Sequence, residues 1–171
     1  MTPSIVRGSL LQRGFEILHN PDNHKNNECG YHCLADIIPE IKNMGYERFI
    51  NDNGLTKGSP IEDLVLENHF NKYGYNLILV SCIYCIENKK TTRTIGHALH
   101  KPNKASDKFA IVMFEGHILN GAPPENGTYD IISTTMTSYK EVLFSLKYII
   151  KNITLHSDII KSKYFESTAT V

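Results

Sequence analysis

The amino-acid sequence predicts an α+β fold in a single domain over residues 1–171, with N-terminal helices packed on a mostly antiparallel sheet. Apolar residues recur at helical spacing early in the chain, whereas later segments are rich in the β-branched and aromatic residues that favour strands. The chain has 171 residues, 41% of them hydrophobic, which is enough to bury one core. It contains no repeat and no linker-like tract that would divide it further.

Three helices are expected from apolar residues at helical spacing behind recognisable start or stop signals. They cover residues 29–38, 59–74 and the segment from 138 onward. The first ends where Pro39 interrupts it. The second begins with Ser59 as N-cap, the proline after it at the first helical position and Glu62 completing a capping box. Ser138 and Glu141 open the third helix in the same way.

Three strands are expected after the second helix. They cover residues 75–86, 109–114 and 129–132, with residues 117–119 continuing or following the second strand. The polar stretch 87–108 is expected to form a hairpin or a surface excursion. A turn at Asn126-Gly127 returns the chain into the last strand.

Composition narrows the classes of function. Lys+Arg and Asp+Glu both number 18 and no dense basic block is present, which argues against nucleic-acid binding. The longest apolar run, Leu77–Ile86, is half the length needed to span a bilayer, so no membrane segment is expected. The first 18 residues lack a secretory apolar region, which predicts a cytosolic, reducing compartment. The four cysteines are therefore expected as thiols or metal ligands and not as disulfides.

Cys29 is the candidate nucleophile. It follows a polar, turn-forming run and precedes an apolar segment that is expected to be helical. A helix N-terminus presents unpaired N–H groups and a partial positive charge, and both favour the reactive thiolate. Cys33, one helical turn further on, is expected in the core.

The residues around Cys29 resemble a known family. The string Asn-x-Cys-Gly-Tyr-His-Cys-Leu-Ala, at residues 27–35, is similar to the nucleophile segment of the papain-like proteases of nidoviruses (arteriviruses and toroviruses). These proteases are compact viral relatives of the ovarian-tumour-type deubiquitinases. The same string is more distantly similar to the foot-and-mouth disease virus leader protease. The similarity covers about ten residues, with a looser one around Gly116-His117. It implies that Cys29 attacks the substrate and that its helix packs on a sheet carrying the histidine.

His117 is the candidate general base among eight histidines. It lies at the exit of an apolar strand beside a glycine, where a ring can be held rigidly while substrate backbone approaches. The family likewise has its histidine late in the chain, at a strand edge. His97 and His100 are the competing candidates, and His32 is expected to be solvent-facing or structural.

A third group should orient the imidazole. Asp130, on the return strand, can pair beside His117 in a hairpin, as in the leader protease that the motif resembles. Asn120 is the rival, because ovarian-tumour-type enzymes have an Asp or Asn shortly after the histidine. The resemblance also implies an upstream amide for the oxyanion, and Asn23, six positions before Cys29, fits that spacing.

A second constellation, Cys82-x2-Cys85 followed by His97-x2-His100, has a spacing suited to tetrahedral zinc. The two cysteines lie inside a strand-like segment without a Gly or Pro for the tight turn that neighbouring ligands need. Buried strand cysteines commonly act as small hydrophobes. The site is therefore an alternative, and no metal or other cofactor is assigned.

The resemblance implies a viral cysteine peptidase with deubiquitinating activity. Its partners would be ubiquitin or a ubiquitin-like modifier and a site in a viral polyprotein. It would act as a monomer in the host cell cytoplasm, as part of a larger polyprotein. The alternative from another class is a zinc-bearing interaction module without hydrolase activity.

Overall fold

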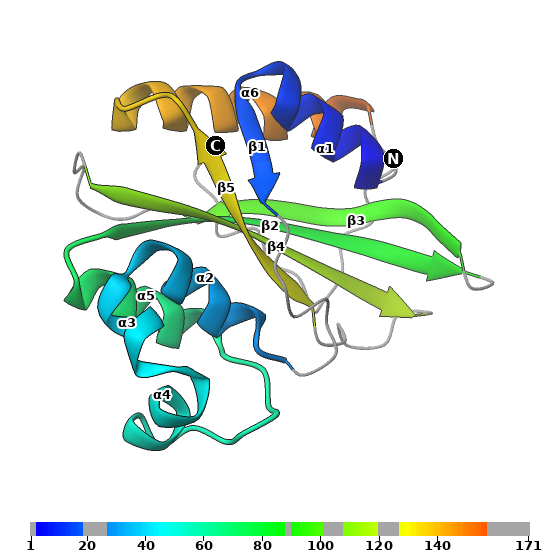
Figure 1. Cartoon of the computed structure of the whole chain (residues 1–171). Coiled ribbons are helices and arrows are strands. Elements are labelled where there is room, and N and C mark those ends of the chain that lie inside the picture. Colours follow the sequence, from blue (N-terminus) through cyan, green and yellow to red (C-terminus); the bar gives the residue numbers. More distant parts are fainter. Residues whose placement is uncertain (1–2, 19–26, 88–89, 101–107, 120–126, 157–171) are drawn as a thin grey trace.

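The fold is built on a five-stranded sheet with the strand order β1-β5-β4-β2-β3 (Figure 1). The structure, a computed structural model, describes residues 3–18, 27–87, 90–100, 108–119 and 127–156, with side chains at 8–18, 27–82, 108–116 and 127–151. The strands are β1 (Phe15–Leu18), β2 (Asn76–Glu87), β3 (Lys90–His100), β4 (Phe109–Leu119) and β5 (Thr128–Thr134). The helices are α1 (Pro3–Gln12), α2 (Cys29–Ile37), α3 (Pro39–Met44), α4 (Tyr46–Asp52), α5 (Asp63–Lys72) and α6 (Tyr139–His156).

The sheet is mostly antiparallel. β1 pairs with β5, β5 with β4, and β2 with β3 in antiparallel ladders. The central pair, β2 with β4, is parallel and runs without a register shift from Asn76–Phe109 to Ile86–Leu119. The α+β class and the mostly antiparallel sheet predicted from the sequence are confirmed.

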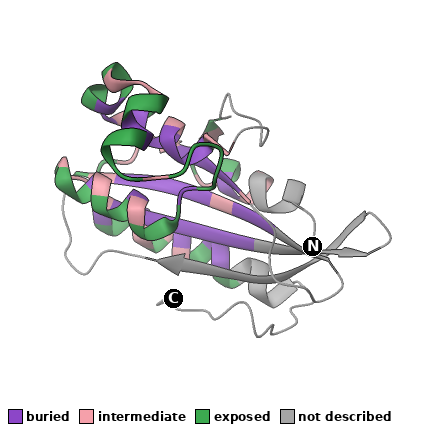
Figure 2. Ribbon diagram, turned by 90° about the horizontal axis from the view of Figure 1, so that it is seen from below, coloured by how far each residue is buried: buried purple, intermediate pink, exposed green. Residues whose placement is uncertain are grey.

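Helices cover both faces of the sheet, α2 to α5 on one face and α1 with α6 on the other (Figure 1). Successive residues of a strand point to opposite faces. Leu79 and Val112 accordingly belong to the core under α2 to α5, whereas Ile78 and Met113 belong to the core under α1 and α6. Buried residues run along the middle of the sheet and along the helix faces that meet it (Figure 2). In the described part of the chain no helix is long and apolar enough to cross a membrane.

Most of the predicted elements are observed. The first predicted helix is α2, and Pro39, instead of only ending it, starts the short helix α3 after the extended residue Ile38. The third is α6, where the Ser138 carbonyl accepts a bond from Val142 N–H at 3.0 Å. The strands fall within two residues of their predicted starts, and the polar stretch contains β3, the second strand of a hairpin with β2.

The predicted start of the second helix is wrong. α5 begins at Asp63, with Glu62 as an extended N-cap residue, so Ser59 does not cap it. The cause is Ile61, which is only 3% exposed and packs on α2 so closely that a Cβ at Gly30 would lie 3.0 Å from the Ile61 Cβ. Extended backbone before α5 carries this side chain into the core, and burial of an isoleucine outweighs a capping box.

Gly127 marks a close approach of β5 to β4. A Cβ at this position would lie 2.4 Å from the Glu115 carbonyl oxygen and 2.5 Å from the Phe114 ring. No side chain fits there unless backbone moves.

We therefore expect Gly127→Ala to lower the free energy of unfolding by about 1–3 kcal/mol, measured by denaturant titration. Gly8→Ala, inside α1 with nothing within 4 Å of the added carbon, is the control and should stabilise by about 0.5–1 kcal/mol. Equal effects of the two substitutions would contradict the close approach.

Candidate functional site

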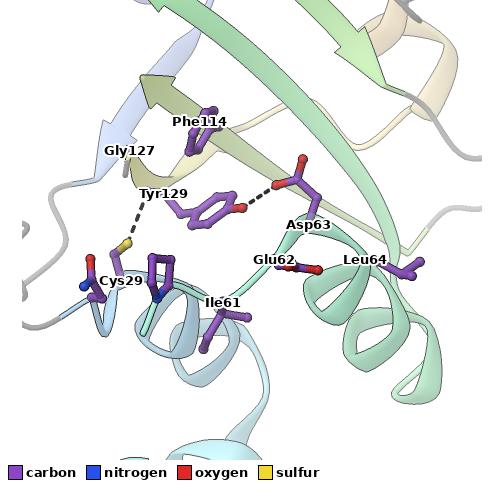
Figure 3. Close-up of a pocket in the computed structure, with 10 residues that line it drawn as sticks. Cys29, Ile61, Glu62, Asp63, Leu64, Phe114, Gly127 and Tyr129 are labelled. Carbon is purple, nitrogen blue, oxygen red and sulfur yellow. Dashed lines mark hydrogen bonds between the residues drawn. The ribbon is translucent and has the colours of Figure 1, made fainter. Parts of the chain in front are cut away.

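Cys29 is the first residue of α2, as the sequence predicts. Its side chain is 5% exposed, and its Sγ accepts a hydrogen bond from the main-chain N–H of Tyr129 in β5 at 3.4 Å (Figure 3). The helix start adds the partial positive charge of its unpaired N–H groups. Cys29, Cys33 and Cys82 are not joined in disulfides, and Cys33 lies deeper in the core at 1% exposure.

A pocket of about 450 Å³ opens at Cys29. Its walls come from three parts of the chain that meet at this point: the start of α2, residues 60–64 leading into α5, and the adjoining parts of β4 and β5 around Phe114 and Tyr129 (Figure 3). Its rim includes Leu64, which is 63% exposed. An apolar, partly open pocket with one thiol at its wall can hold a short segment of polypeptide next to the sulfur.

Asn27 fixes the chain just before Cys29. It has a φ of +56°, in the left-handed region that asparagine tolerates better than most residues. Its side-chain amide donates a hydrogen bond to the Gly58 carbonyl at 2.8 Å. This bond joins the two segments that flank the pocket, the one entering α2 and the one entering α5.

Tyr129 spans the pocket wall between two helices (Figure 3). Its phenolic O–H donates a hydrogen bond to the Asp63 carboxylate at the first residue of α5. Its ring packs on Phe114, its register partner in β4, with 5.1 Å between ring centroids. Burial, and secondarily the negative charge of Asp63, raise the pKa of Tyr129 far above its usual range, so the phenol remains a donor.

The charges of the pocket lining are acidic. Glu62 and Asp63 contribute carboxylates, and the described lining includes no lysine, arginine or histidine. The pocket therefore complements a neutral or basic polypeptide segment more than an acidic one.

His32, on α2, forms a pair with Glu28 at 3.5 Å between Nε2 and Oε1, which agrees with the structural role expected for it.

His117 lies in β4, opposite Tyr84 of β2. Its side chain is outside the described part. Among the described residues the last pair of β4 with β5 is Glu115–Thr128. His117 lies three residues beyond Phe114, the β4 residue that packs on Tyr129, a step of about 10 Å along the strand. Since the ladder with β2 has no shift, position 117 has the same parity as Met113, which packs on the face opposite α2. The backbone thus does not by itself join position 117 to the Cys29 face.

Asp130 is buried in β5 at 5% exposure. Its register partner in β4 is Met113 and not His117, so the expected pairing of Asp130 beside His117 in the hairpin is wrong. Four residues of β4 separate the two positions, or about 13 Å. The other two predicted site residues, Asn23 and the rival Asn120, lie outside the described residues.

The β2–β3 register argues against the alternative zinc site. Cys82 is directly opposite His97, but Cys85 is opposite Arg93 and His100 is opposite Leu79. Cys85 and His100 are thus about six residues apart along the hairpin, roughly 20 Å, whereas zinc ligands must meet around one ion. Cys82 itself is buried in the core under α6. Among the residues whose side chains are described, which do not include Cys85, His97 or His100, no group of three or more His, Cys, Asp or Glu could hold a metal ion.

Tyr129 and Asp63 are site residues that the sequence does not predict. The sequence places Tyr129 only in a strand, and Asp63 inside a helix that in the structure begins later than expected. The one local signal was an acidic residue near the N-terminus of a helix. The tyrosine partner, 66 positions away, could be found only from the fold.

Comparison of this chain with models of known families, with curated proteins and with solved structures finds no match.

Proposed function

We propose that this protein is a cysteine peptidase that hydrolyses peptide or isopeptide bonds, with Cys29 as the nucleophile. The observation that carries the proposal is the environment of the sulfur. Cys29 is the first residue of a helix, accepts a main-chain N–H bond from Tyr129 and borders a pocket of about 450 Å³. A thiol with directed donors and space for a substrate is the minimum requirement for thiol-dependent acyl transfer.

The reaction would proceed in two halves. Thiolate sulfur attacks the carbonyl carbon, and the resulting oxyanion is stabilised by main-chain N–H groups at the start of α2. In this proposal His117 holds the thiol proton and delivers it to the leaving amine, leaving a thioester on Cys29. Water then adds to the thioester, and the carboxylic acid and the free thiol are released.

The substrate class follows from the motif around Cys29 and from the pocket. The similarity to papain-like nidoviral proteases and ovarian-tumour-type deubiquitinases supports ubiquitin or a ubiquitin-like modifier as substrate, together with a viral polyprotein site, in the host cell cytoplasm. Carboxylates of Glu62 and Asp63 on the pocket wall complement a basic polypeptide segment. For the third catalytic group Asp130 and Asn120 remain the alternatives, and Asp130 would have to act without being the register partner of His117.

The first test is the reactivity of the thiol. We expect Cys29 to be alkylated at least about tenfold faster than Cys33 near neutral pH, with a rate midpoint below the value of about 8.5 for a free thiol. Site-resolved alkylation against pH measures both residues in one sample. Cys33 is the internal control because it lies in the same helix but is 1% exposed. Equal rates for the two residues would remove Cys29 as the nucleophile.

The second test separates chemistry from binding. Cys29→Ala should abolish hydrolysis of a fluorogenic ubiquitin C-terminal substrate while the protein remains folded and still binds ubiquitin, measured by calorimetry. Cys33→Ala is the matched control: it should cost about 1 kcal/mol of stability by leaving a small cavity, with hydrolysis retained. Hydrolysis by the Cys29→Ala protein would disprove the mechanism.

The third test concerns the base. Loss of a general base costs roughly 10²–10⁴-fold in turnover, so His117→Ala should fall in that range at saturating substrate. His32→Ala removes the histidine that pairs with Glu28 and should leave turnover near normal. If His117→Ala turns over at the wild-type rate, the base is another group. That result would agree with the β4 backbone, in which position 117 has the same parity as Met113 on the face opposite α2.

A further inference from the structure

Tyr129 makes two hydrogen bonds in opposite directions. Its main-chain N–H donates to Cys29 Sγ at 3.4 Å, and its phenolic O–H donates to Asp63. One residue of β5 therefore links the first residue of α2 with the first residue of α5 (Figure 3). These residues are 100 and 66 positions from Tyr129 in the chain, so the link is a product of the fold.

The N–H bond to sulfur has a chemical consequence. A thiolate is a much stronger acceptor than a thiol, so a main-chain N–H aimed at the sulfur stabilises the anion selectively. The effect depends on direction and distance, and hence on where the backbone of Tyr129 lies. Tyr129 is only the second residue of β5, after Thr128, near a strand end where backbone position is least constrained by the ladder.

The side chain of Tyr129 restrains that backbone. Its ring lies between Phe114 on one side and the Asp63 carboxylate at its tip. Asp63 is itself held at the N-terminus of α5, where the helix dipole favours a carboxylate. The extended segment before α5 is fixed in turn by burial of Ile61 against Gly30 of α2. The chain of contacts closes back on the helix that carries Cys29.

We infer that Asp63 is a positioning residue for the Cys29 thiolate and that it acts through Tyr129. Asp63 holds the phenol, the phenol holds the start of β5, and the Tyr129 N–H is thereby kept on the sulfur. The inference rests on the proposed role of Cys29 as nucleophile, but it is tested on the thiol itself and does not require a substrate. Because the raised pKa of Tyr129 keeps the phenol protonated, it remains the donor to Asp63 throughout the range in which Cys29 titrates.

The charge of Asp63 makes the test decisive in sign. A nearby carboxylate disfavours a thiolate, so if Asp63 acted only through its charge, its removal would lower the midpoint of the Cys29 rate profile. Positioning predicts the reverse, because the N–H bond is lost. Asp63→Ala and Asp63→Asn remove the same charge, but only the asparagine retains an oxygen that can accept from the phenol.

The experiment measures alkylation of each cysteine by iodoacetamide between about pH 5 and pH 10 in the full chain, with peptide mass spectrometry as readout. Tyr129→Phe removes only the hydroxyl and changes no charge near neutral pH. We expect it to raise the Cys29 midpoint and to slow alkylation at neutral pH about tenfold, the equivalent of one pKa unit. Asp63→Ala should have a higher midpoint than Asp63→Asn, which should lie at or below wild type. Glu67→Ala, an exposed carboxylate on the same helix, should change nothing.

The result that overturns the inference is an unchanged Cys29 midpoint in Tyr129→Phe, or equal midpoints for Asp63→Ala and Asp63→Asn. Faster alkylation of Cys33 in these variants would equally overturn it, because that would show a general loosening of the core around α2. Hydrolysis is measured separately on the wild type. Absence of hydrolysis with the predicted midpoint shifts would refute the proposed function and leave the positioning of the thiol standing.

Discussion

The structure depends on the burial of its two central strands on both faces. β2 and β4 pair in parallel from Asn76–Phe109 to Ile86–Leu119, and their side chains alternate between two apolar cores, so each face needs a layer of helices. The first half of the chain supplies α2 to α5 for one face, and the terminal helices α1 and α6 supply the other. β5, antiparallel beside β4, then runs under the start of α2, and this is what brings a strand backbone to the sulfur of Cys29.

The elements that sequence reasoning predicted are those whose signal is local. α2, α6 and the three long apolar strands have periodicity, caps or turn residues within their own segments. β1 has only the four residues Phe15–Leu18 and exists because β5, more than a hundred positions later, offers an edge for pairing. The predicted start of α5 is wrong for a related reason. The sequence has a capping signal at Ser59, but Ile61 packs on Gly30 and holds the backbone extended. Tertiary packing outweighed local preference in both cases.

In the candidate site, too, the sequence predicts what is encoded locally and not what depends on tertiary packing. Cys29 could be predicted because a turn-forming run before an apolar helix is a local pattern, and the structure has it as the first residue of α2. The partners of a thiol are set by strand register, which the sequence does not encode locally. In the β4–β5 ladder, Asp130 lies opposite Met113 and not His117, and Tyr129 lies opposite Phe114 at the pocket. In the β2–β3 ladder, Cys85 and His100 lie far apart. Each of these pairings changes a chemical assignment, and none could be derived from spacing alone.

The electrostatics of the pocket explain why directed donors matter more here than net charge. Glu28 precedes Cys29, and Glu62 and Asp63 stand on the pocket wall, so the formal charges near the sulfur oppose a thiolate. The helix start and the Tyr129 N–H act in the other direction, but only over short distances and only with correct geometry. Tyr129 offsets part of this unfavourable charge, because its phenol directs an O–H dipole at Asp63 while its main-chain N–H points at Cys29. A residue with donors at both ends lets the Asp63 carboxylate lie beside the same pocket as the Cys29 sulfur, which the proposed mechanism requires as a thiolate.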